Sequence, residues 1–82
     1  DPAVAAALGA ALARSAGGPI SAVHDVRMRE TARGYIVNYR AQAYPAVSVQ
    51  TAYDAIEEIE RRARQEFPTI WRIVARIQPE GP

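Results

Sequence analysis

The sequence predicts an open-faced α/β sandwich, with two helices on one face of a three-stranded sheet in the order helix, strand, strand, helix, strand. Two segments repeat apolar residues every three or four positions, as helices do, and three segments repeat them at every second position, as strands do. The chain has 82 residues, enough for a single modest core. We expect one domain over residues 1–82, because two helices on one sheet face bury all of these apolar stripes at once.

The first helix is expected over residues 3–16. Its alanine-rich composition strongly favours helix. The apolar stripe consists of Val4, Leu8, Ala11 and Leu12. Gly17, Gly18 and Pro19 follow and stop the helix.

Two strands are expected next, over residues 20–30 and 35–44, joined by a short turn into a hairpin. In the first strand, one face carries Ile20, Ala22, His24, Val26 and Met28, and the other carries Ser21, Asp25, Arg27 and Arg29, with Val23 as the exception. In the second strand, the apolar face carries Tyr35, Val37, Tyr39, Ala41 and Ala43, and the residues that alternate with them are Asn38, Arg40 and Gln42.

The second helix is expected over residues 48–67. It has the most regular stripe, made of Val49, Ala52, Ile56, Ile59, Ala63 and Phe67. Ser48 is a good N-cap, and Pro68 removes a backbone donor at the other end. Three glutamates each precede an arginine by four residues, namely Glu57, Glu58 and Glu60 before Arg61, Arg62 and Arg64. This order favours ion pairs on a solvated helix face, rather than a catalytic pair of carboxylates.

The last strand is expected over residues 70–78, with Trp71, Ile73, Ala75 and Ile77 in phase. Because it follows a helix, it can lie parallel to one strand of the hairpin. One face of the sheet is then left uncovered, and by alternation it carries Arg27, Arg29, Arg40, Arg72 and Arg76. Such a face is either solvated, or meets acids of a second subunit, or binds an anion.

Few residues are suited to catalysis. The chain has no cysteine, no glycine-rich phosphate loop and a single histidine, so we expect no enzymatic activity and no required cofactor. His24 is the only imidazole available to a metal, and Asp25 or another carboxylate would supply oxygen. The simpler interpretation is a half-buried strand histidine satisfied by a hydrogen bond, because a zinc site normally takes three or four protein ligands.

The charge balance argues against nucleic acid as a partner. The formal net charge is only +1. Aromatic side chains for stacking on bases would have to come from Tyr35, Tyr39 or Tyr44, and two of these, Tyr35 and Tyr39, fall on the face opposite the arginines. We therefore expect no nucleic-acid partner.

Five short motifs stand in order along nearly the whole chain. They are Val23-His24-Asp25-Val26-Arg27-Met28-Arg29, the strand Tyr35 to Ala43, Pro45 to Val49 leading into Ala52-Tyr53, Phe67-Pro68, and Gln78-Pro79. Together they resemble the cytoplasmic C-terminal domain of cation diffusion facilitator (cation efflux) transporters. The resemblance implies a metallochaperone-like, ferredoxin-like αββαβ fold. It also implies a homodimer with a regulatory role, on the cytoplasmic face of the membrane, below a transporter of zinc or similar divalent ions.

The sequence departs from the family pattern at several positions. His24 is kept, but four positions where family members often place metal ligands carry Arg40, Tyr53, Arg76 and Gln78. Arginine is always protonated and cannot coordinate a cation. We therefore expect the usual zinc site to be absent, zinc to bind weakly at most, and the dimer to be held by packing and by pairs of arginine and acid across the two-fold axis.

An alternative function is a small regulatory module that binds an anionic ligand or a partner protein through the arginine-rich sheet face. The chain begins at Asp1 rather than Met, so we expect a processed product or a piece of a longer protein, and the resemblance implies a transmembrane part attached to it. The piece itself is expected to be soluble, because its most apolar stretch, from Ala3 to Ala13, is too short to span a bilayer.

Overall fold

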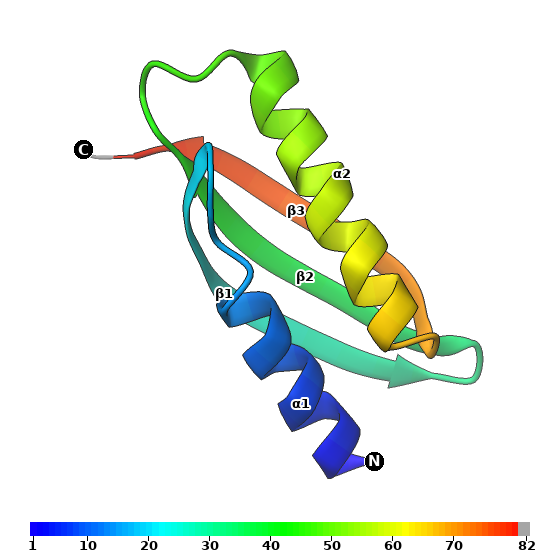
Figure 1. Cartoon of the computed structure of the whole chain (residues 1–82). Helices are drawn as coiled ribbons and strands as arrows, with labels where there is room; N and C mark the ends of the chain where they lie inside the picture. The colour runs from blue at the N-terminus through cyan, green and yellow to red at the C-terminus, as the bar shows by residue number, and fades with distance from the viewer. Residues whose placement is uncertain (81–82) are drawn as a thin grey trace.

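The computed structural model describes residues 1–80 as two helices packed on one side of a mixed sheet. The elements are α1 (Pro2–Ala13), β1 (Ile20–Thr31), β2 (Gly34–Ala43), α2 (Val49–Glu66) and β3 (Ile70–Pro79). The strand order is β1-β2-β3, with β1 antiparallel and β3 parallel to the central β2. Both helices lie on the same face of the sheet (Figure 1). The expected open-faced sandwich, including its parallel last strand, is confirmed.

Helix α1 ends at Ala13, three residues before the expected end at residue 16. The Asp1 side chain caps its first turn by accepting from the Ala3 amide at 2.9 Å. Gly17 and Ile20 exchange two backbone hydrogen bonds of 2.9 and 3.0 Å, for which the chain must already have left the helix. No helix among residues 1–80 is long and apolar enough to cross a membrane.

Helix α2 buries the middle of its predicted stripe, namely Ala52, Ile56, Ile59 and Ala63. The Ser48 hydroxyl accepts from the Thr51 amide at 3.1 Å, which confirms the predicted N-cap. Val49 was expected on the same stripe, but its side chain is exposed. The helix reaches the core only from Ala52 onward, one turn after Val49.

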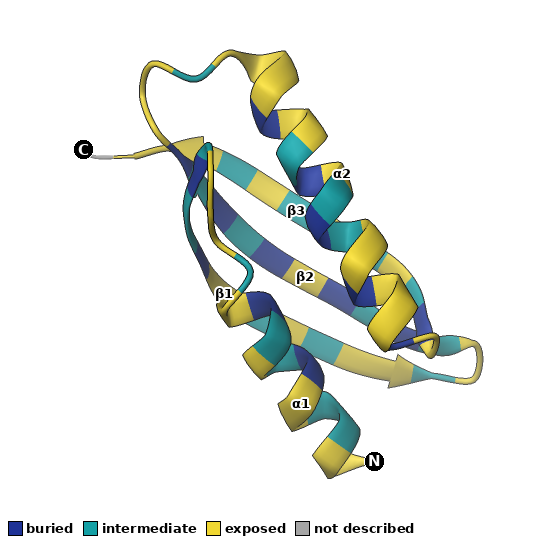
Figure 2. Ribbon diagram, viewed as in Figure 1, coloured by how far each residue is buried: buried dark blue, intermediate teal, exposed yellow. Residues whose placement is uncertain are grey.

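The core lies between the helices and the covered face of the sheet. All five apolar residues expected on β2 are buried: Tyr35, Val37, Tyr39, Ala41 and Ala43. Buried positions recur along β2 and on the inner sides of both helices (Figure 2). Leu8 and Leu12 of α1 are almost fully buried, and each such side chain contributes roughly 1.5–3 kcal/mol through the hydrophobic effect.

Strand β1 does not alternate as the sequence predicts, because it contains two register shifts, between Ile20 and Ala22 and between His24 and Arg27. Each bulge adds a residue and moves the following side chains to the other face. Val23 is therefore buried, whereas His24, which was expected to be half-buried beside Val26 and Met28, is exposed.

Candidate functional site

The open face of the sheet, opposite the helices, carries the arginines that the alternation predicts. Arg27, Arg29, Arg72 and Arg76 are exposed, and Arg40 is half-buried. The parallel register pairs Arg40 of β2 directly with Arg76 of β3. Because neighbouring strands lie about 4.8 Å apart, two guanidinium groups leave adjacent strands side by side.

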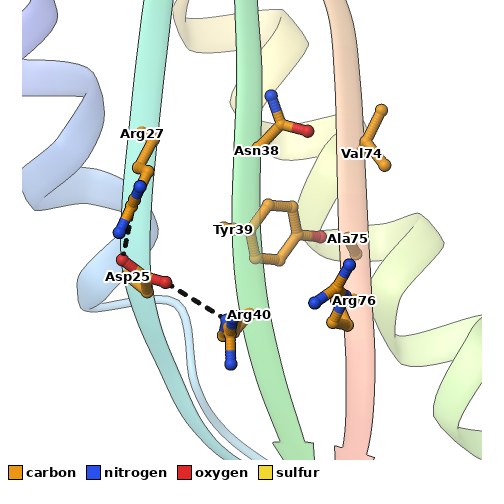
Figure 3. Close-up of a pocket in the computed structure, with 8 residues that line it drawn as sticks. All are labelled: Asp25, Arg27, Asn38, Tyr39, Arg40, Val74, Ala75 and Arg76. Atoms are coloured by element: carbon orange, nitrogen blue, oxygen red, sulfur yellow. Dashed lines mark hydrogen bonds and ion pairs between the residues drawn. The ribbon is translucent and has the colours of Figure 1, made fainter.

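These two arginines line a solvent-open hollow of about 370 Å³ on the sheet, which we call the arginine pocket. Its lining residues are Asp25, Arg27, Asn38, Tyr39, Arg40, Val74, Ala75 and Arg76. Figure 3 shows Arg27, Arg40 and Arg76 on three neighbouring strands around this hollow. Of the five predicted arginines, Arg29 and Arg72 lie outside it. Arg72 instead stacks on the Trp71 ring, 4.7 Å from its centre.

Asp25 is held between two of the pocket arginines. Its Oδ1 accepts from Arg27 Nε at 3.1 Å, and its Oδ2 lies 3.1 Å from Arg40 Nε (Figure 3). The bond from Arg27, together with the charges of Arg27 and Arg40, holds the pKa of the Asp25 carboxyl below its usual value. The residue sits in the β1 bulge with φ 54°, a left-handed conformation that aspartate tolerates better than most residues. Asp25 is therefore a paired carboxylate.

His24 lies next to Asp25 and is the register partner of Arg40. The imidazole is exposed and has a permanent positive charge on the neighbouring strand, which opposes cation binding. Within residues 1–80, no three side chains of His, Cys, Asp or Glu gather closely enough to hold a metal ion.

Tyr53 and Gln78, the other two positions at which the resemblance implied a changed ligand, lie apart from Arg40 and Arg76. They line a second hollow of about 310 Å³, between the start of α2 and the end of β3. Three large apolar side chains around it are exposed, Tyr44 by 48%, Val49 by 71% and Tyr53 by 54%. We call these three the apolar cluster. Sequence reasoning missed it, because Val49 was assigned to the core and Tyr44 to the end of a strand.

The charged face of α2 differs from the predicted ladder of pairs. Glu58 binds Arg61 at 2.6 Å and Arg62 at 2.8 Å, and these bonds lower its pKa to about 2. Glu60 accepts instead from the Tyr39 hydroxyl at 2.8 Å. Its carboxyl is half-buried, and this burial raises its pKa. The Glu57–Arg61 and Glu60–Arg64 ion pairs are not formed among the residues the structure describes. Glu58 forms ion pairs with both Arg61 and Arg62, and the Glu60 side chain is directed toward the sheet.

The fold is shared with solved domains of metal transporters. The chain superposes with a TM-score of 0.84 on CzrB, named as a candidate zinc transporter, at 23% identity over 99% of this chain and 98% of that chain. The chain superposes on the metal-bound C-terminal domain of the CzcD transporter from Thermotoga maritima with a TM-score of 0.80, at 18% identity over 99% of this chain and 92% of that chain. A copper form of a MamM C-terminal-domain variant gives 0.78 at 15% identity, over 98% of each chain. A search of curated protein sequences gave no match.

A family model, described as the cytoplasmic domain of cation efflux proteins, matches residues 11–80. This match spans most of the chain, from the end of α1 to the end of β3, and includes the arginine pocket and the apolar cluster. It confirms the resemblance drawn from the five motifs. The chain therefore belongs to the family of cation efflux protein cytoplasmic domains.

Proposed function

We propose that this chain is the dimerisation and regulatory domain of a cation-efflux-type transporter of divalent metal ions, attached to a transmembrane part of the same protein. The observation that carries the proposal is the family match over residues 11–80. The role is structural and regulatory: two copies associate below the transporter and bias its conformation.

The second part of the proposal is that the usual zinc site of the family is absent. Arg40 and Arg76 stand at two of the changed ligand positions, and they are direct neighbours in the sheet. Two guanidinium groups cannot coordinate a cation and would repel one. Asp25 is already paired with Arg27 and Arg40, so these residues do not fit a divalent metal.

Dimerisation without metal is supported by the apolar cluster. Exposed apolar patches mark association surfaces, and Tyr44, Val49 and Tyr53 gather at one end of the molecule. A chain of this size buries only a modest core, so covering the cluster would add stability. We propose that a second copy covers the cluster. Pairs between open-face arginines outside the arginine pocket and acids of the other copy would contribute to the same contact.

Sedimentation equilibrium tests both parts, first in chelator and then with zinc in place of the chelator. We expect a dimer of the same dissociation constant in both conditions. A monomer in both would overturn the dimerisation role. A dimer that forms only with zinc would show that a ligand set including His24 survives. Calorimetric titration of zinc into chelator-treated protein adds a second check, because a stoichiometric site of micromolar affinity would contradict the loss of the metal site.

A further inference from the structure

We infer that the arginine pocket is a binding site for a small dianion with oxygen acceptors, of the phosphate or dicarboxylate class. The inference goes beyond the dimerisation role, because every residue it uses belongs to one chain. It rests on the charge of the pocket, on the way its one carboxylate is engaged, and on its shape.

The pocket carries more positive charge than its own residues neutralise. Three guanidinium groups, those of Arg27, Arg40 and Arg76, face one carboxylate, that of Asp25, which leaves an excess of two positive charges. Arg76 forms no ion pair with any acid among residues 1–80. Like charges directly opposite each other on neighbouring strands are destabilising. A dianion between Arg40 and Arg76 would remove this repulsion.

Asp25 leaves the outer ends of its arginines available. It contacts Arg27 and Arg40 through their Nε atoms, at 3.1 Å in each case. The terminal Nη groups of Arg40 and all the donors of Arg76 make no hydrogen bond within the described part of the chain. Guanidinium groups present paired N–H donors that match two oxygens of a carboxylate or phosphate, so Arg40 and Arg76 together offer such donors from adjacent strands.

The local backbone fixes this arrangement. The second bulge of β1 turns Asp25 onto the open face with φ 54°, a sparsely populated conformation. Arg40 and Arg76 are held on two paired strands, so both donors come from rigid elements. At about 370 Å³, the pocket falls at the lower end of the roughly 300–1,000 Å³ typical of small-molecule sites. This volume suits a small metabolite.

The test is calorimetric titration of the protein with inorganic phosphate, with pyrophosphate and with malonate, in about 150 mM chloride so that diffuse attraction is screened. We expect one site per chain for at least one of the three probes. Binding of the phosphates alone, or of malonate alone, identifies the class of ligand. Absence of heat and of thermal stabilisation with all three probes at millimolar concentration would overturn the inference.

Four variants distinguish a specific anion site in the arginine pocket from general attraction to a positively charged surface. We expect Arg76→Gln to weaken binding about fivefold or more, since it removes a charged donor. Asp25→Asn, which suits the same backbone conformation, should tighten binding about threefold by removing a competing carboxylate. Arg29→Gln, on the same face outside the pocket, and Arg64→Gln, on α2, should change it less than about twofold. Equal losses in Arg76→Gln, Arg29→Gln and Arg64→Gln would contradict the site.

The same samples keep this inference distinct from the proposed function. Sedimentation of each variant reports the dimer independently of ligand binding. If the protein dimerises without metal but binds none of the probes, only the anion site is wrong. If it binds a probe as a monomer, only the dimerisation role is wrong.

Discussion

The Tyr39 hydroxyl donates a hydrogen bond of 2.8 Å to Glu60 Oε2, which joins the central strand β2 to α2 through the edge of the core. Burial and the neighbouring carboxylate raise the pKa of Tyr39, so the hydroxyl stays a proton donor at all ordinary pH values. Burial also raises the pKa of Glu60, and the bond from Tyr39 partly offsets this effect. The half-buried Glu60 carboxylate is tolerated here because the Tyr39 hydroxyl donates a hydrogen bond to it.

Removing the hydroxyl should cost stability. In Tyr39→Phe the half-buried Glu60 carboxylate loses its donor, and we expect the free energy of unfolding to fall by about 1–3 kcal/mol. Urea denaturation at neutral pH measures this loss in the free energy of unfolding. Tyr53→Phe is the matched control, because that side chain is exposed, and it should change stability by less than about 0.5 kcal/mol. Equal effects of the two variants would contradict the role of the bond.

The raised pKa of Glu60 predicts a pH dependence. The folded state binds the proton more tightly than the unfolded chain, whose reference value is 4.5. The contribution of Glu60 to stability is therefore full below that value and is lost as pH rises through the folded pKa. Glu60→Gln keeps an acceptor for Tyr39 but does not titrate. Relative to the original chain, this variant should gain stability between about pH 4 and pH 7, measured by urea denaturation at each pH.

The exposed Glu66→Gln is the control for that series, since it removes the same charge from the same helix, and Glu66 is not among the groups that shift the pKa of Glu60. The effect specific to Glu60 is the pH dependence that the Glu60→Gln series shows beyond this control. A Glu60→Gln difference that is constant from pH 4 to pH 7 would show that burial does not raise the pKa of Glu60.

Gly34 is required at the start of β2. Its φ is 129°, and an added Cβ would lie 2.3 Å from the Thr69 carbonyl oxygen. That oxygen accepts from the Tyr35 amide at 2.9 Å, so it cannot move away without losing a backbone bond. We expect Gly34→Ala to destabilise the protein by about 2–4 kcal/mol. At Gly17 an added Cβ would meet no atom within 4 Å apart from its own chain neighbours, so Gly17→Ala should be nearly neutral. Thermal denaturation of both variants compares their stabilities.

The apolar cluster predicts a variant that separates folding from association. Val49→Asp places an acid in the first turn of α2, where it favours the helix, but it buries a charge if a second copy covers the cluster. We expect a folded monomer, with the dimer weakened about tenfold or more by sedimentation. Thr51→Asp adds the same charge in the same turn, outside the second hollow, and should leave the dimer intact. A dimer unchanged in Val49→Asp would exclude this contact.

The sequence predicted the elements better than it predicted the site. The stripe of α2 and the alternation of β2 are regular because each element has one buried face along most of its length, and their core residues were identified. The bulges of β1 were not predicted, because a bulge changes which residues of a strand face the core and requires no particular residue type. As a result, the prediction that His24 is half-buried was wrong.

The arginine pocket shows a second limit. Alternation placed Arg40 and Arg76 on one face, but their adjacency depends on the offset between β2 and β3, which the helix between them sets through tertiary packing. The same holds for Glu60, whose burial depends on how far α2 rotates toward Tyr39. Spacing within α2 identified the Glu58–Arg62 pair but not the partner of Glu60, because a partner on another element is known only from the structure.

The irregular course of β1 also restricts how copies of this chain can meet. β1 is an edge strand, and an edge strand offers unpaired backbone groups to a strand of another molecule. Its two bulges interrupt the even ladder that such pairing needs. Growth of the sheet across β1 from one molecule to the next, the route to fibrils, is therefore disfavoured.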